Sequence, residues 1–234
     1  MALGASRTVL INLKSRADRR KAAERELMRL GAAGYDNDCE IMLRARPADA
    51  AGFPSRGAHG CFQSHLDSLK NAVGCATLLI LEDDIRFNLA AAGAARSAFS
   101  KATPSWDIFY GGCVFAPGSH VPAGSGLISI DPGLALRQTH CIGFSGPVIP
   151  ALISYLEAIK ARRPGAPEGG PMHVDGAYNR FRRDNPHLRT VACAPAFGLQ
   201  RPSRSDIAPN QLFDRLPITR EGVELLRGLK SRMQ

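Results

Sequence analysis

The stretch Thr77–Asn88, TLLILEDDIRFN, runs a nearly unbroken apolar segment directly into three consecutive acids, Glu82, Asp83 and Asp84. An apolar run of this length predicts a strand that is buried on both faces, as in parallel sheets covered by helices. Three adjacent carboxylates repel one another and favour water, so we expect a compensating group at this strand end. The identity of that group decides the function.

The segments before this strand follow the order strand, helix, strand. RTVLINLK predicts a first buried strand, and CEIMLRA predicts a second. Between them we expect a helix that starts at Ser15, with Asp18 three residues later as an approximate capping box, and that stops at Gly31 or Gly34. This order predicts an α/β fold with a parallel sheet covered by helices.

The rest of the chain continues the pattern. Apolar residues at helical spacing from Phe62 to Val73 predict a helix that ends at Gly74, directly before the acid-tipped strand. After that strand we expect a helix over 89–99, a strand in WDIFYGG that ends at its two glycines, and a hairpin turning at Asp131-Pro132-Gly133. We then expect a helix entered through Pro147 and a helix in HVDGAYNRFRRDNP. A strand in LRTVACAP and a closing amphipathic helix complete the prediction.

Composition indicates one globular domain with an anionic partner. The 234 residues are 44% hydrophobic and 22% charged, enough for one sizeable core. Lys and Arg outnumber Asp and Glu by 30 to 21, a net charge of +9, which suits a phosphorylated substrate, a membrane surface or nucleic acid. Charge alone does not choose among these three.

The cysteines and the apolar runs indicate a cytoplasmic protein. Six cysteines are scattered without any metal-binding spacing, which predicts buried free thiols in a reducing compartment. We find no signal peptide and no apolar run long enough to cross a bilayer. The expected location is the cytoplasm, with possible peripheral contact with the inner face of the cell membrane.

The acids at the strand end suit a divalent cation. Ligands of open α/β sheets gather outside the carboxyl ends of the strands. In an extended chain Glu82 and Asp84 point to one side and Asp83 to the other, and paired carboxylates attract a hard cation. The alternative is a solvated strand end paired with Arg86 or with a helix N-terminus. Because the chain is rich in arginine, we favour a metal that bridges the acids to a nucleotide diphosphate.

Six blocks in order resemble glycosyltransferase family 25, the lipopolysaccharide and lipooligosaccharide core glycosyltransferases related to the collagen galactosyltransferases. The most specific are GAHGCFQSHLDSLKNAV, LLILEDDIRF and the SRSDI of QRPSRSDI; VLINLKSRADRR, WDIFYGG and HVDGAYNRF also fit. The resemblance implies a GT-A-like (Rossmann-like) α/β fold with a mixed, mostly parallel sheet flanked by helices. It further implies a nucleotide-sugar donor, often UDP-galactose, a Mn²⁺-type cation (Mg²⁺ being the alternative) and a glycan acceptor, often on a lipid.

In such an enzyme residues 1–234 form a single domain. Residues 1–112 hold the nucleotide-sugar and the metal, 113–210 supply the acceptor and catalytic half, and 211–234 form the amphipathic helix. The sequence departs from the family where Glu-Asp-Asp replaces a literal Asp-x-Asp, which leaves the choice of metal ligand open. The Gly- and Pro-rich block 161–171 leaves the acceptor open as well.

The acid triplet and the end of the first strand receive the donor roles. Asp84 and Glu82 are the expected metal ligands, with His173 completing the shell or orienting a carboxylate. Asp83 contacts the ribose or donor sugar, or caps the next turn. The base and phosphates are expected at Asn12, Arg16 and Arg19. Arg19 and its neighbour Arg20 could alternatively be surface charges of the helix.

Further roles fall on two helices and on the end of the chain. His65 lies beside an apolar helix stripe, either in the donor site or as a core residue. Asp175 is the expected general base, which predicts an inverting reaction; alternatively it caps its helix. A lid over the diphosphate, or else a disordered tail, is expected at Arg201, Arg204, Ser205 and Asp206. The closing helix packs on the core or rests on an anionic bilayer.

Two other functions compete with glycosyl transfer. A metal-dependent phosphodiesterase or nuclease could recruit Asp49, His59 and Asp67, although no paired metal-ligand spacing supports it. A nucleic-acid-binding module would account for the charge and for runs such as NRFRRDNPHLR, but it lacks an aromatic stacking platform. We therefore expect a glycosyltransferase that binds no nucleic acid.

Overall fold

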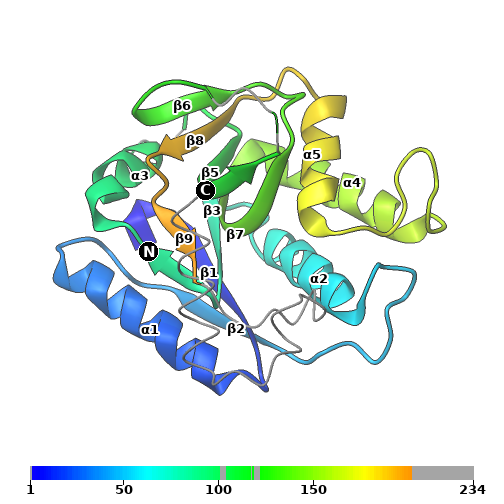
Figure 1. Ribbon diagram of the computed structural model, residues 1–234, viewed down its shortest axis with the longest axis horizontal. Helices are drawn as coiled ribbons and strands as arrows, with labels where there is room; N and C mark the ends of the chain where they lie inside the picture. Colours follow the sequence, from blue (N-terminus) through cyan, green and yellow to red (C-terminus); the bar gives the residue numbers. More distant parts are fainter. Residues whose placement is uncertain (1, 101–103, 117, 119–121, 202–234) are drawn as a thin grey trace.

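The computed structural model describes residues 2–100, 104–116, 118 and 122–201. A seven-stranded sheet in the order β2-β1-β3-β7-β5-β8-β6 forms its centre (Figure 1). The strands of this sheet are β1 (Arg7–Leu13), β2 (Glu40–Arg44), β3 (Thr77–Glu82), β5 (Ile108–Phe115), β6 (Gly126–Ile130), β7 (Leu136–Ser145) and β8 (Thr190–Ala194).

The sheet is mixed and mostly parallel. β1 pairs in parallel with β2 and β3, and β5 pairs in parallel with β8. β7 is antiparallel to both β3 and β5, and β6 is antiparallel to β8. All strands of the sheet except β6 and β7 therefore point the same way. The predicted α/β class, Rossmann-like with helices flanking a mostly parallel sheet, is confirmed.

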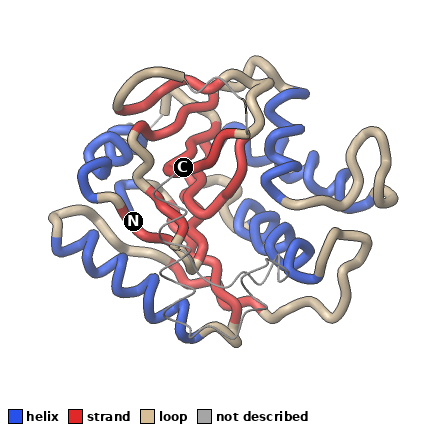
Figure 2. Tube along the Cα trace, viewed as in Figure 1, coloured by secondary structure: helices blue, strands red, loops and turns tan. Residues whose placement is uncertain are grey.

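Helices cover both faces of the sheet (Figure 2). α1 and α3 pack on one face, and α2, α4 and α5 pack on the other. Their bounds are α1 (Ala17–Ala32), α2 (Arg56–Lys70), α3 (Ala92–Phe99), α4 (Ile149–Ala161) and α5 (Val174–Asp184). Short 3-10 helices also form: η1 (Ala2–Gly4) before β1, η2 (Leu89–Ala91) before α3 and η3 (Gly146–Val148) before α4.

The acid-tipped strand β3 is buried on both faces, as its apolar run predicts. Leu78 and Ile80 point into the core beneath α2, α4 and α5, whereas Leu79 and Leu81 point into the core beneath α1 and α3. Successive side chains of a strand alternate between its faces, so only an uninterrupted apolar run suits this central position.

The strand order reverses at β1, so the carboxyl ends of β1 and β3 lie at a topological switch point. The chain passes from β1 to β2 through α1, and from β2 to β3 through α2. β2 and β3 then flank β1 on opposite sides, and the two connecting helices cover opposite faces. Ligands of open α/β sheets bind where the strand order reverses in this way.

A second, two-stranded sheet lies beside the end of β3 and was not predicted. β4 (Ile85–Phe87) pairs antiparallel with β9 (Gly198–Gln200). β9 passes so close to β5 that a Cβ at Gly112 would lie 1.8 Å from the Gly198 carbonyl oxygen. The prediction that the strand in WDIFYGG ends at its glycines was wrong. β5 continues to Phe115, and the missing side chain of Gly112 makes room for β9.

Two local predictions need correction. The turn at 131–133 forms, with Leu134 N donating to Asp131 O at 3.1 Å, but β6 and β7 do not make a hairpin. β5 and β8 lie between them in the sheet. α1 begins after Arg16 rather than at Ser15, and the Asp18 carboxylate accepts from the Arg16 guanidinium instead of closing a capping box.

The helices predicted over 89–99, after Pro147 and within HVDGAYNRFRRDNP are confirmed as η2 with α3, α4 and α5. The closing amphipathic helix lies outside the described residues. Among the helices that the structure does describe, none is long and apolar enough to span a membrane.

A buried arginine joins α5 to the turn after β6. Arg182 is almost fully buried. Its guanidinium donates to Thr190 Oγ1 at 3.1 Å, to Leu134 O at 3.0 Å and to Asp131 O at 2.7 Å. It also lies 5.9 Å from the centre of the Tyr110 ring. Because these oxygens accept hydrogen bonds from the guanidinium, Arg182 holds α5 against the turn and against β8. We call this set of contacts the Arg182 clamp.

We expect Arg182→Met to lower the free energy of unfolding by about 2–4 kcal/mol, because it leaves buried carbonyl oxygens without donors. Arg183→Met is the matched control, since the neighbouring Arg183 is exposed and should change stability by less than about 0.5 kcal/mol. Urea denaturation measures both. Equal effects of the two substitutions would contradict the clamp.

Candidate functional site

The three acids lie at the carboxyl end of β3, where the chain turns into β4. Glu82 is the last residue of β3, and Asp83 and Asp84 form the turn. Asp83 is 7% exposed and Asp84 6%, so neither is the solvated strand end of the alternative interpretation. Buried carboxylates require partners, and each of the three has a different set.

Asp83 is held by groups from β1 and α1. Asn12 Nδ2 donates to Asp83 Oδ2 at 2.7 Å, and Arg19 Nη1 lies 3.1 Å from Asp83 Oδ1. Asn12 Nδ2 also donates to Arg16 O at 3.1 Å. Through its bond to Asp83, Asn12 joins the end of β1 to the end of β3. Burial raises the pKa of Asp83, and the charge of Arg19 opposes this shift. The compensator of Asp83 is therefore an arginine of the chain.

Glu82 faces the opposite side of the sheet, toward α2. Thr139 Oγ1 donates to Glu82 Oε1 at 2.8 Å, and His65 Nε2 lies 3.5 Å from the same oxygen, an ion-pair distance. Burial raises the pKa of Glu82, but His65 and Thr139 lower it more, so it falls below its ordinary value. The compensator of Glu82 is the buried imidazole.

Asp84 has a neutral partner instead. Gln200 Nε2 donates to its Oδ2 at 2.9 Å, while its Oδ1 is buried without a hydrogen-bond partner in the described chain. Arg201 contacts the main-chain oxygens of Asp83 and Asp84 (2.6 and 2.7 Å) rather than their carboxylates. Burial, followed by the charge of Glu82, raises the pKa of Asp84 to about 6. Among the described residues, no cationic side chain forms a hydrogen bond with the Asp84 carboxylate.

The first turn of α5 faces the same region. Asp175 is half-buried, and its Oδ1 accepts from Gly176 N at 2.8 Å. Burial and then the charges of Glu82 and Asp175 raise the pKa of the Cys61 thiol on α2. α5 packs against α2, and the Tyr178 hydroxyl of α5 lies 3.1 Å from His65 Nδ1. The helix that carries Asp175 therefore contacts the residue that lies beside Glu82.

The structure brings most of the predicted residues together. Those that contact the triplet, or belong to it, are Asn12, Arg19, His65, Glu82, Asp83, Asp84 and Arg201. Arg16 instead binds the Asp18 carboxylate at 3.1 Å, which lowers the pKa of Asp18 to about 2. His173 is the exposed residue before α5 and makes no capping hydrogen bond. Arg204, Ser205 and Asp206 lie outside the described residues.

Sequence reasoning missed several residues of the site. One of them is Cys61, which lies four residues before the predicted His65 on the same helix. This spacing places the two side chains on one face of the helix and could have indicated a joint site. The polar pair Thr139-His140 within the apolar strand β7 was a weaker signal. Gln200 gave no signal, because only the β4–β9 pairing brings it to Asp84.

The comparisons with known proteins add little to this geometry. No family model and no curated protein matches the chain. Among the solved structures that are similar to it at low identity are the following two. A glycosyltransferase involved in the glycosylation of the major capsid of PBCV-1 has 10% identity over 95% of this chain and 99% of that chain, with a TM-score of 0.37. The nucleoside-diphosphate-sugar pyrophosphorylase from Vibrio cholerae RC9 has 13% identity over 79% and 71%, with a TM-score of 0.36.

At these TM-scores neither likeness supports an inference about activity, so the functional interpretation depends on the side chains.

The two turn acids should respond in opposite ways to removal of their charge. In metal-free protein at about pH 8, we expect Asp84→Asn to stabilise the fold by roughly 1–3 kcal/mol, because a buried and uncompensated charge is lost. Asp83→Asn should destabilise by about 1–3 kcal/mol through loss of the Arg19 pair. Asp18→Asn, in an exposed pair, is the control with a change below about 1 kcal/mol. Urea denaturation with chelator present measures all three, and destabilisation by Asp84→Asn would contradict this assignment.

The gain from Asp84→Asn should also depend on pH. The unfolded chain ionises this carboxyl near pH 4 and the folded chain at about 6, so the native state binds more protons between these values. The contribution of Asp84 to stability therefore falls as pH rises through this window. The variant should gain little below pH 4 and its full increment above about pH 7. A gain of the same size at both ends would count against a buried charge.

Proposed function

We propose that the protein transfers a hexose from a nucleotide-sugar to a hydroxyl group of a glycan, with a divalent cation bound at Asp84 and Glu82. The observation that carries the proposal is Asp84, a buried carboxylate with an unpartnered Oδ1 at the reversal of strand order. A bound Mn²⁺ or Mg²⁺ would neutralise the charge that develops on the leaving nucleoside diphosphate. The donor set fits, because carboxylate oxygens are the ligands that such hard cations prefer.

The rim of the site suits the remainder of a nucleotide diphosphate. Arg19 and Arg201 place two positive charges beside the turn acids. Asn12 Oδ1 is buried without a partner among the described residues, which leaves an acceptor for an N–H group of the base. Arg16 can reach a phosphate only by giving up its pair with Asp18.

Asp175 is the proposed general base. In this role it accepts the proton of the acceptor hydroxyl while that oxygen attacks the anomeric carbon. Attack by an acceptor on the face opposite the leaving group inverts the configuration of the sugar. Asp175 is half-buried in the first turn of α5, and Tyr178 of the same helix contacts His65 beside Glu82, which supports this assignment.

The finer identity of the substrates is proposed from the family resemblance alone. It favours UDP-galactose as the donor and a lipopolysaccharide- or lipooligosaccharide-type glycan as the acceptor. Membership of family 25, cytoplasmic location and contact with an anionic membrane surface likewise stay predictions.

The contacts of the alternative residues favour transfer over phosphodiester cleavage. A two-metal enzyme would need further ligands close to the triplet. Asp67 is instead paired with Arg44 and accepts from Gln63 Nε2, and the His59 Nδ1 atom lies 3.1 Å from Asp49 O. In the part of the chain that the structure describes, these side chains do not form a metal-ligand group with the triplet.

A thermal-shift panel of UDP-, GDP- and CMP-sugars, each with and without Mn²⁺, tests the donor. We expect stabilisation by a UDP-sugar with metal, about 2.7 kcal/mol at a hundredfold excess over Kd. Asp84→Asn should abolish this metal-dependent shift and reduce transfer at least about a hundredfold. Asp18→Asn should behave like the parent protein. Full transfer by Asp84→Asn in excess chelator would overturn the cation's role.

Asp175→Asn tests the base. Its kcat should fall by about 10²–10⁴-fold while the donor-induced thermal shift is retained, because the amide cannot accept the proton. Asp184→Asn, at the other end of α5, is the matched control. Analysis of the product's anomeric configuration completes the test, and retention of configuration would reject Asp175 as an inverting base.

A further inference from the structure

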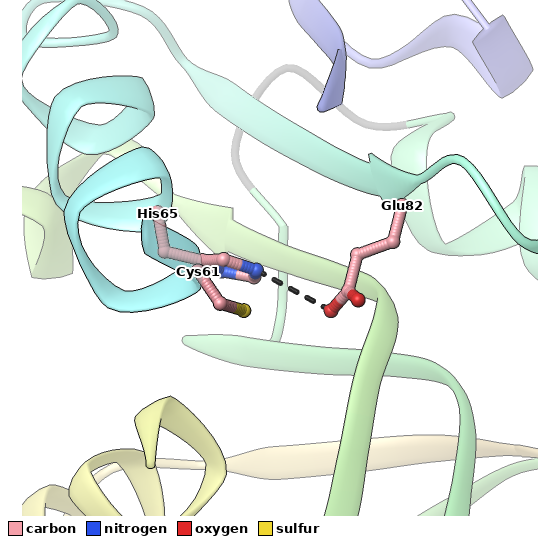
Figure 3. A group of neighbouring side chains, drawn as sticks. All are labelled: Cys61, His65 and Glu82. Carbon is pink, nitrogen blue, oxygen red and sulfur yellow. Dashed lines mark ion pairs between the residues drawn. The ribbon is translucent and has the colours of Figure 1, made fainter. Parts of the chain in front are cut away.

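Cys61, His65 and Glu82 form a second group of metal-type ligands on the α2 side of the triplet. Cys61 and His65 come from successive turns of α2, and Glu82 comes from the end of β3 (Figure 3). One ligand atom from each lies within 4.8 Å of the other two. Figure 3 shows the three side chains pointing toward one another. Neither Asp84 nor His173 belongs to this group.

His65 is oriented as a metal ligand would be. It is fully buried, and its Nδ1 lies 3.1 Å from the Tyr178 hydroxyl, which fixes the plane of the ring. Its Nε2 points at Glu82 Oε1 from 3.5 Å and has no hydrogen-bond partner in the described part of the chain. Buried ring nitrogens are normally satisfied, and metal-binding histidines commonly have one nitrogen held by a second residue.

The carboxylate is oriented as well. Thr139 Oγ1 donates to Glu82 Oε1 at 2.8 Å, so the group is held from β7 while it faces α2. Outer hydrogen bonds of this kind fix the geometry of ligating carboxylates and histidines. The group therefore contains two ligands that are positioned before any ion binds.

The chemistry of the three donors selects a different cation from the one proposed at Asp84. Thiolate, imidazole and carboxylate are the ligands of zinc, and three protein ligands leave a fourth position of its tetrahedron open. Mn²⁺ and Mg²⁺ prefer sites built of oxygen alone. A dication would also remove the repulsion between a Cys61 thiolate and the neighbouring carboxylates.

We propose that Cys61 Sγ, His65 Nε2 and a Glu82 carboxylate oxygen form a site for Zn²⁺, with the fourth position open to water or another small ligand. The thiol proton is released to solvent when the ion binds. Glu82 is shared with the cation site proposed at Asp84, but this inference concerns only the affinity of the protein for an ion and does not depend on the proposed transfer reaction.

Titration of the metal-free full-length protein with Co²⁺, followed by absorption spectroscopy, tests the site. Co²⁺ substitutes for Zn²⁺ and reports a thiolate ligand through a near-ultraviolet charge-transfer band. We expect this band to saturate at one equivalent and to disappear when Zn²⁺ is added. Cys61→Ser, a nearly isosteric change, should abolish the band, and Glu82→Gln should weaken Co²⁺ binding at least tenfold.

Two controls make the result specific. Cys75→Ser, which alters another half-buried free cysteine, should leave the band unchanged. Asp84→Asn should also leave it unchanged, so that failure of the zinc site and failure of the proposed transferase site can be told apart. Absence of the band from the parent protein, or its persistence in folded Cys61→Ser, would overturn the proposal.

Discussion

The hydrogen bond between Asn12 and Asp83 is the contact on which the arrangement of this site depends. It joins the carboxyl ends of β1 and β3 across 71 residues of sequence, and Arg19 reinforces it from α1. With Asp83 fixed toward β1, Glu82 faces α2, and Asp84 meets the residue that ends β9. Each of the three consecutive acids thus has a different set of protein partners. A strand end exposed to solvent would not provide such partners.

These environments differ in how the charge is balanced. An arginine pairs with Asp83, a buried histidine lies at ion-pair distance from Glu82, and burial is the dominant influence on Asp84. A fold that leaves one buried carboxylate without a counter-charge is less stable than it could be, and such a cost is typical of functional sites. The stability of the fold comes from other parts of the molecule. These are the two hydrophobic clusters on either face of the sheet and the hydrogen-bonded Arg182 clamp.

Local patterns were sufficient to predict the central part of the fold. The apolar run of β3 required burial on both faces, and helical spacing in α2, α4 and α5 was clear. The end of β3 and the residues after β1 were predicted to meet because parallel strands end at one edge of a sheet.

Long-range pairing accounts for the rest. Nothing local distinguishes a hairpin at 131–133 from two strands that β5 and β8 separate, and the three-residue strands β4 and β9 are too short to recognise. Gln200 and Thr139 therefore entered the site unpredicted. Cys61 was interpreted as an ordinary buried thiol because its partner Glu82 lies on another element.

The β4–β9 pair gives the chain a fixed point of departure. Main-chain hydrogen bonding anchors Arg201, the last described residue, at Asp84. Gln200, the residue before it, donates to the Asp84 carboxylate, so a displacement of β9 would remove this neutral donor. The electrostatics of the site therefore depend mechanically on a single short strand.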